Sequence, residues 1–375
     1  MDRTQAPAFK QVEHISLLNA KKYPLDNGIP LFFIDAGEQD LVRIEFIFDN
    51  VAWNAASPLQ AFATNALLQE GTSNYTAAQL AEKFDYYGAF LQKDYSYDQS
   101  SVVLYTLNKH LSSVLPLLRE ILTDAIFPQS EIDTFIRNQQ QKLSVSLEKN
   151  DVLARRSFNQ VLFGNTLYGH APVVEEYAQL QRSQLLEYYK KAYQPANCTL
   201  VVSGKVSETT LKSMNATFGN NWEGSTAVDK NEVSFITGTG KTHFLERPDA
   251  LQSALRLGQI AINRTHPDFP ALQVLNTIFG GYFGSRLMAN IREDKGYTYG
   301  IGSGIASLKD AGYFFIASEV GADVCTAAIA EIEKEMKLLR TVLVSEGELA
   351  LVRNYMLGSL LGSLENAFSH ADKFK

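Results

Sequence analysis

The sequence predicts an α+β protein built from two tandem, homologous α/β sandwich domains, each with a mainly antiparallel sheet and helices on one face. A length of 375 residues suits two domains. In both halves, an apolar helical stretch lies between strand-like runs at the same relative position. The stretch 220–240 is rich in Gly, Ser, Thr and Asn, which is typical of a linker. We therefore expect a first domain over 1–220, a linker over 221–240 and a second domain over 241–375.

The composition is that of a globular chain with a large core. Hydrophobic residues make up 45% and charged residues 20% of the sequence. The net charge of −7 argues against nucleic acid or an anionic membrane as partner. No apolar run approaches the length of a membrane span, and residues 1–21 lack the apolar region of a signal peptide. We expect a cytoplasmic location by default, or a periplasmic one if a signal peptide has been removed.

The two cysteines, Cys198 and Cys325, lie far apart and in no metal-type spacing. This excludes a disulfide framework, and two buried thiols in a reducing compartment are the simplest interpretation.

The first half alternates strand-like and helical patterns after an extended leader. Apolar residues at Leu111, Val114, Leu118 and Ile121 recur at helical spacing, which predicts an amphipathic helix over 110–126. In order, we expect strands over 29–35 and 41–50, helices over 59–68 and 77–87, strands at 90–93 and 101–107, helices over 110–126, 131–149 and 183–193, and a strand over 199–206.

The second half repeats this plan. We expect strands over 241–246 and 253–260, a helix over 270–279, strands over 297–306 and 312–320, a helix over 324–339 and another from 345 onward. A last helix and closing strand, equivalent to 183–206, would complete the repeat. We therefore expect the second domain to be truncated.

Four short segments carry recognisable patterns. They are 62–72 (FATNALLQEGT), 193–204 (YQPANCTLVVSG), 279–287 (FGGYFGSRL) and 292–299 (REDKGYTY). In this order and spacing they resemble the pitrilysin/insulinase family of zinc peptidases, in the two-subunit type of the processing peptidases. The resemblance implies that the repeat is the metallopeptidase-like duplication of that family.

The family's metal site is degenerate in this chain. In the family, His-x-x-Glu-His precedes the Gly-Thr at the end of the helix, so that two His bind zinc and the Glu activates the bound water. Counting back from Gly71 places these three on Phe62, Asn65 and Ala66, which cannot do this chemistry. The family's third ligand, a Glu, falls in 139–147, where no acid occurs; Glu148 is near, but a lone carboxylate cannot hold zinc. We expect no cofactor in this chain, and ordinary helix packing at these positions.

The six histidines offer no replacement for this site. No two of them stand three or four residues apart, as a helical ligand pair would.

The resemblance implies a role for Arg292 and Tyr299, which are seven residues apart as in the family. An Arg offers a rigid fork of donors to a peptide carbonyl or carboxylate, and a Tyr hydroxyl can donate to an oxyanion. In two-subunit members, this pair acts in trans on the zinc site of the partner. The alternative is that Arg292 is a surface cation and Tyr299 a packed strand aromatic.

Gly280, Gly281 and Gly284 have two interpretations as well. They form a loop that contacts the peptide, or a turn after a helix in which glycine supplies a positive φ. The resemblance also implies peptide binding along an exposed strand edge, near 94–101 by position.

We expect this chain to be the non-catalytic subunit, supplying Arg292 and Tyr299, of a heterodimeric zinc peptidase that hydrolyses peptides or unfolded segments. Its partner would be a homologous subunit that holds the zinc. The alternative is a catalytically dead scaffold or binding protein of the same fold, which has no need of an Arg/Tyr pair. A self-sufficient peptidase with an unusual metal site is a third interpretation, and the missing ligands argue against it.

Overall fold

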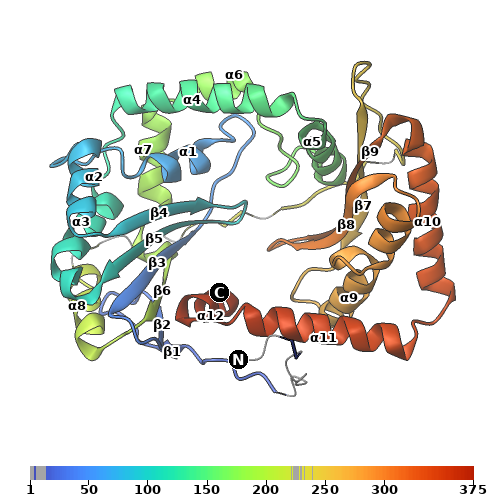
Figure 1. Ribbon diagram of the computed structural model, residues 1–375. Helices are drawn as coiled ribbons and strands as arrows, with labels where there is room; N and C mark the ends of the chain where they lie inside the picture. The colour runs from blue at the N-terminus through green and yellow to red at the C-terminus, as the bar shows by residue number, and fades with distance from the viewer. Residues whose placement is uncertain are drawn as a thin grey trace.

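The computed structural model describes residues 4–5, 14–220, 222, 228, 230–231, 233–238 and 240–375. Two β-sheets with their helices lie side by side, one in each half of the chain (Figure 1). The two-unit α+β fold predicted from the sequence is confirmed. Positions 221, 223–227, 229, 232 and 239 of the predicted linker lie outside the described residues.

The first sheet has six strands in the order β1-β2-β6-β3-β5-β4. β2 and β6 are parallel, and all other neighbours are antiparallel. The strands are β1 (Lys21–Lys22), β2 (Leu31–Asp35), β3 (Leu41–Asp49), β4 (Phe90–Tyr95), β5 (Gln99–Leu107) and β6 (Cys198–Gly204). All but β1 coincide with predicted strands.

Helices cover the face of this sheet to which Val42, Ile44 and Phe46 of β3 point. They are α1 (Gln60–Leu67), α2 (Ala77–Tyr86), α3 (Leu111–Thr123), α4 (Gln129–Leu147), α6 (Val174–Ala178), α7 (Arg182–Ala192) and α8 (Glu208–Phe218), with the short turns η1 (Asn108–His110) and η2 (Pro195–Asn197). The predicted helices at α1, α2, α3, α4 and α7 are confirmed. α6, α8 and α5 (Asn150–Phe163) were not predicted, and α5 buries only Leu162 and Phe163.

The second sheet has three antiparallel strands in the order β7-β9-β8. A small core forms between this sheet and its helices, around Ile291, Ile301, Ile316 and Ile332. The elements are β7 (Gln252–Ala261), α9 (Phe269–Asn276), η3 (Thr277–Gly281), η4 (Met288–Asp294), β8 (Thr298–Ser307), β9 (Gly312–Gly321), η5 (Ala322–Val324), α10 (Cys325–Thr341), α11 (Glu346–Gly362) and α12 (Ala367–Phe374).

The strand predicted over 241–246 is wrong. Its counterpart in the first half is β2, which pairs with β6 and the short β1. The described part of the second half contains no counterpart of β6, so 241–246 has no strand beside it. Without a partner for its backbone, this segment lies exposed, with Phe244 and Leu245 in solvent.

Each half contributes one helix to the free face of the other half's sheet. α5, which follows α4, packs on β7, and α12, which follows α11, packs on β6 and β2. In Figure 1, α4 and α11 run along opposite sides of the molecule and deliver these two helices. This reciprocal exchange is the clearest structural sign of the internal duplication.

A buried charge network fixes α12 on the first sheet. Arg43 of β3 donates to Asp372 at 2.7 Å and to Glu45 at 2.8 Å. Lys375 reaches Glu45 at 2.7 Å. Since Arg43 and Glu45 are buried, these pairs satisfy charges that would otherwise be costly to bury.

A second contact between the halves is aromatic. Phe163, Tyr168 and Tyr313 belong to one cluster, in which side chains from both halves pack together. Beside them, Asp98 accepts hydrogen bonds from the Tyr168 hydroxyl at 2.6 Å and from the Lys309 amide at 3.0 Å. The halves are therefore joined at two separate places.

Candidate functional site

The helix that would hold zinc in the resembled family is α1, and its centre is an apolar packing surface. Phe62 lies 5.5 Å from the Tyr95 ring and 5.7 Å from the Phe135 ring, measured between centroids. Ala66 offers no ligand atom. A zinc ion requires several converging N, O or S donors, and these side chains do not provide them.

Asn65, at the position of the family's catalytic Glu, is a structural cross-link. Its side chain is 1% exposed. Its amide nitrogen donates to the Asp94 carbonyl at 2.8 Å, and its oxygen accepts from the Tyr193 hydroxyl at 2.9 Å. The amide thus ties α1 to the edge strand β4 and to the end of α7, and both of its polar ends are used.

The stretch that would supply the third ligand lies in α4. Gln140 there donates to the Val174 carbonyl at 3.2 Å. Glu148, at the end of this helix, pairs with Arg247 at 3.3 Å. The described residues contain no group of three or more His, Cys, Asp or Glu side chains able to hold a metal ion.

The predicted glycines follow α9 in the second half. A Cβ on Gly280 would lie 2.5 Å from Ser303 Oγ and 2.8 Å from Ser303 N, so glycine is needed for close approach to β8. At Gly281 and Gly284 the nearest atoms would belong to Asn276 at 3.2 Å and Tyr282 at 2.8 Å. Gly280 is buried, whereas the other two are exposed. Packing alone therefore accounts for Gly280.

The segment around these glycines is firmly anchored to α11. Arg286 makes a bidentate pair with Glu348, at 2.8 and 2.7 Å, and the hydrogen bonds from Arg286 lower the pKa of Glu348. The ring of Tyr282 lies 4.7 Å from that of Tyr355. These contacts fix the position of the chain that leads to Arg292.

Arg292 lies on η4, a π-helical turn, which is an irregularity often found at functional sites. Its guanidinium lies over the Phe283 ring, 4.6 Å from the centroid. Within the part of the chain that the structure describes, Arg292 pairs with no carboxylate, in contrast to Arg286. Its guanidinium makes no hydrogen bond to another described residue either, so its donors can bind a ligand.

Tyr299, near the start of β8, is 93% exposed. Among the described residues, no hydrogen-bond partner of its hydroxyl is found. The Tyr297 amide donates to the Ile291 carbonyl at 3.0 Å and closes a loop that brings the chain near Arg292 back to β8. The packed aromatic of this segment is Tyr297, which contacts the second core.

The two sets of predicted residues lie in different halves of the chain. Phe62, Asn65 and Ala66 lie on α1, which packs against the first sheet, whereas Arg292 and Tyr299 belong to the second half (Figure 1). No hydrogen bond, ion pair or ring contact joins the two sets in the described ranges.

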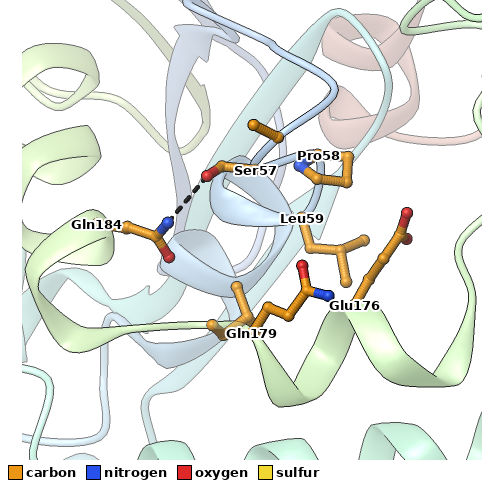
Figure 2. A pocket seen from close by; sticks show the side chains of 8 residues that line it. Ser57, Pro58, Leu59, Glu176, Gln179 and Gln184 are labelled. Carbon is orange, nitrogen blue, oxygen red and sulfur yellow. Dashed lines mark hydrogen bonds between the residues drawn. The ribbon is translucent and has the colours of Figure 1, made fainter.

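A small cavity lies at the amino end of α1, away from all of these residues. It is bounded by the loop at Ser57 and by α6 and α7, where Gln184 donates to Ser57 Oγ at 2.9 Å (Figure 2). None of its lining side chains belongs to the predicted site.

Three residues of this region were not predicted from the sequence. One is Phe283, whose ring lies against the Arg292 guanidinium. The others are Thr298 and Ser318, whose hydroxyls donate hydrogen bonds to the backbone beside Tyr299. Gly300, directly after Tyr299, was the available signal, because glycine inside a strand often marks a bulge.

The fold and the degenerate α1 together define a peptidase-like protein whose metal helix lacks its ligands. Residues 179–356 match the family model described as "Peptidase M16 inactive domain". This match, which covers less than half of the chain, and the relatives below confirm the resemblance to the pitrilysin/insulinase peptidases.

Several bacterial proteins are similar in sequence. The "Uncharacterized zinc protease YmxG" of Bacillus subtilis is 26% identical over 307 residues, 80% of this chain and 73% of that protein. The "Non-peptidase homolog YmxG" of Helicobacter pylori is 24% identical over 302 residues, 78% of this chain and 68% of that protein. The "Probable inactive metalloprotease YmfF" of Bacillus subtilis is 25% identical over 196 residues, 52% of this chain and 45% of that protein.

Two solved structures share the fold. One is a protease from Helicobacter pylori, with a TM-score of 0.87 at 15% identity, covering 96% of this chain and 89% of that one. The other is a peptidase M16 inactive domain from Pseudomonas fluorescens, with a TM-score of 0.78 at 22% identity, covering 92% and 86%. Over the residues described, no helix is both long and apolar enough to cross a membrane.

Proposed function

We propose that this chain is the non-catalytic subunit of a heterodimeric zinc peptidase, to which it supplies Arg292 and Tyr299. One observation carries the proposal. Packing residues stand at the family's ligand positions on α1, whereas the other half presents the exposed Tyr299 and Arg292, which pairs with no carboxylate among the described residues. A chain that has lost only one part of a two-part site suits a complementary partner.

The chemistry of the pair supports this proposal. Hydrolysis of a peptide bond builds negative charge on the carbonyl oxygen, and donors aimed at that oxygen stabilise the transition state. The guanidinium of Arg292 rests on Phe283, so part of its conformational entropy is already lost before binding. Tyr299 projects into solvent, where a peptide held between two subunits can reach it.

The proposed partner is a homologous subunit with an intact His-x-x-Glu-His helix, and the zinc belongs to that subunit. The substrate class is peptides or unfolded segments, selected by size and flexibility within an enclosed chamber. β4 supports peptide binding, since it is an edge strand with Phe90, Gln92 and Asp94 exposed, and such an edge can add an extended peptide. We propose a cytoplasmic location, which agrees with two unpaired cysteines.

The names of relatives are compatible with this proposal. One relative is called a zinc protease, whereas two others are called a non-peptidase homologue and an inactive metalloprotease.

A titration tests the proposal. The partner is a homologue with the intact zinc motif, taken first from the neighbouring reading frame, and the assay follows cleavage of a quenched fluorescent peptide. We expect little activity from either chain alone, and activity that rises to a plateau at one equivalent of this chain. Activity of the partner that does not change across the titration would contradict the proposal.

The second candidate is a scaffold or binding protein that has lost all catalysis. The observation that favours it is Asn65, whose amide donates one hydrogen bond and accepts another within the fold. The scaffold predicts a stable complex in the same titration without any gain of peptidase activity.

A further inference from the structure

Tyr299 is exposed because β8 contains one residue more than its neighbour. Thr298 pairs with Val320, and Ile301 pairs with Ser318. Between these two pairs, β8 holds Tyr299 and Gly300, whereas β9 holds only Glu319. Two residues opposite one is the definition of a β-bulge, a feature that is common beside active sites.

The bulge decides which face of the sheet Tyr299 occupies. Side chains alternate along a regular strand, so a residue two before Ile301 would share its face. Ile301 faces the second core, beneath the π-helical turns and α10. A regular β8 would therefore direct Tyr299 toward the helices. The extra residue turns it to the opposite face, where it is 93% exposed.

Two side-chain hydroxyls hold this irregular backbone. Thr298 Oγ1 accepts from the Gly300 amide at 3.1 Å and donates to the Glu319 carbonyl at 2.6 Å. Ser318 Oγ donates to the Gly300 carbonyl at 3.0 Å. A bulge leaves backbone groups without their ladder partners, and these hydroxyls satisfy three of them.

The hydroxyl of Ser318 is otherwise unexpected at its position. Ser318 is buried on the core face of β9, between Ile316 and Val320, where an apolar side chain would fit the pattern. Its hydrogen bond to the bulge accounts for a polar residue there, since a buried hydroxyl needs a partner.

We propose that Thr298 and Ser318 are positioning residues, which hold the bulge that presents Tyr299 to the peptide carbonyl. The proposal rests on the proposed function for the identity of the peptide, but the geometry of the bulge is testable without it. Neither residue touches the substrate; both act through the direction in which Tyr299 points.

The first experiment measures this direction by spectroscopy on the full chain. Tyr299→Trp provides the reporter in a background where Trp53 and Trp222 are replaced by Phe. We expect red-shifted emission and strong quenching by iodide. Deleting Gly300 should shift the emission to the blue and reduce quenching, while Thr298→Val and Ser318→Ala should alter quenching in the same direction. Thr298→Ser, which keeps the hydroxyl, should restore the wild-type values.

Thermal melting of each variant identifies any that fail to fold. If the Gly300 deletion fails to fold, Thr298→Val and Ser318→Ala provide the test. If Thr298→Val and Ser318→Ala both fold and neither they nor any other folded variant changes the iodide quenching, the proposal is overturned.

The second experiment measures turnover by the mixed enzyme, with the hydroxyl variants in place and Tyr299 native. We expect Thr298→Val and Ser318→Ala to lower kcat between about tenfold and a hundredfold with little change in KM, since misplacing a group by about 1 Å can cost about a hundredfold. Thr298→Ser should recover the rate.

The two arms separate this inference from the function on which it rests. If Tyr299→Phe is fully active while the reporter responds as expected, the proposed function fails and the bulge retains its geometric role. If Tyr299→Phe is impaired but neither hydroxyl variant changes quenching or rate, the positioning role is wrong and the proposed function stands.

Discussion

Asn65 occupies the place where related peptidases carry the carboxylate that activates water. Its two hydrogen bonds join three elements, and the side chain is almost fully buried. A residue so placed contributes to stability whether or not the protein has any catalytic role.

We expect Asn65→Ala to lower the free energy of unfolding by about 1–3 kcal/mol. The change removes the Asn65 partner of the buried Tyr193 hydroxyl and of the partly buried Asp94 carbonyl. Urea unfolding measures the loss. Asn74→Ala, at an exposed bend where the described residues offer its side chain no hydrogen bond, is the control and should change stability little. Equal stability of the two variants would contradict the structural role of Asn65.

Removal of metal ions should not change the thermal stability of this chain. Phe62 and Ala66 offer no ligand, so we expect less than one equivalent of zinc after dialysis and the same Tm with or without EDTA. Metal analysis and thermal melting check this expectation. One tightly held zinc that is lost on substitution of residues in α1 would contradict it.

Among the elements, the glycine turn after α9 depends on close backbone approach. A Cβ at Gly280 would meet Ser303 at 2.5 Å, so we expect Gly280→Ala to lower the Tm by several degrees, as strain of about 1–3 kcal/mol would. Gly347→Ala is the matched control, because a Cβ there meets nothing within 4 Å. Thermal melting of both variants measures the difference. A similar Tm for the two would contradict the prediction and show that β8 shifts to accommodate the added Cβ.

α12 should be held by charge. Burial acts to raise the pKa of Asp372, but hydrogen bonds from Arg43 and Lys375 outweigh it, and the pKa lies below its ordinary value. Because the pKa of Asp372 is lower in the folded than in the unfolded chain, the Arg43–Asp372 pair stabilises the fold at pH values above the unfolded pKa. This contribution is lost as the pH falls through the folded pKa of Asp372. The loss therefore belongs to the range below about pH 4.

We expect Asp372→Asn to increase hydrogen exchange in α12 at neutral pH and to reduce the stability lost between about pH 6 and pH 3, relative to the wild type. Hydrogen-exchange mass spectrometry and melting at both pH values measure this. Glu208→Gln removes a fully exposed pair with Lys212 and should change neither quantity. A wild-type exchange pattern in Asp372→Asn would show that apolar packing alone holds the helix.

The sequence predicted most elements because their patterns are local. β3 and α3 carry runs of apolar residues at strand and helix spacing, and both lie where expected. The strand predicted at 241–246 failed because pairing is not local: its own residues favour a strand, but the neighbouring strand is absent from the described second half. The helix exchange between halves was not predicted either, because α5 buries few residues and lacks a clear periodic face.

The site could be predicted only in part. The spacing of Arg292 and Tyr299 drew attention to their segment, whose role remains a proposal. The lack of ligand atoms at Phe62 and Ala66 follows from residue type alone. The bulge that exposes Tyr299 was not readable, since it depends on the pairing register with β9. The contact of Arg292 with Phe283 is a tertiary contact between two turns, which no sequence period encodes.

At the scale of the whole molecule, the two halves are joined by exchanged helices, a charge network and an aromatic cluster. These contacts fix the face that carries Tyr299 relative to the rest of the chain. The central claim is that this face completes the metal site of a partner, and it concerns an assembly rather than the isolated chain.

Turnover by the mixed enzyme with Tyr299→Phe tests that claim most directly. The change removes one hydroxyl and keeps the ring, so folding should be unaffected. Tyr297→Phe is the matched control. It removes the same hydroxyl group two residues earlier in the chain, from a ring that packs on the second core. We expect Tyr299→Phe to lower kcat by about a hundredfold, the usual cost of removing one donor to a developing oxyanion, with Tyr297→Phe close to wild type. Full activity of Tyr299→Phe in a complex that forms normally would contradict the claim.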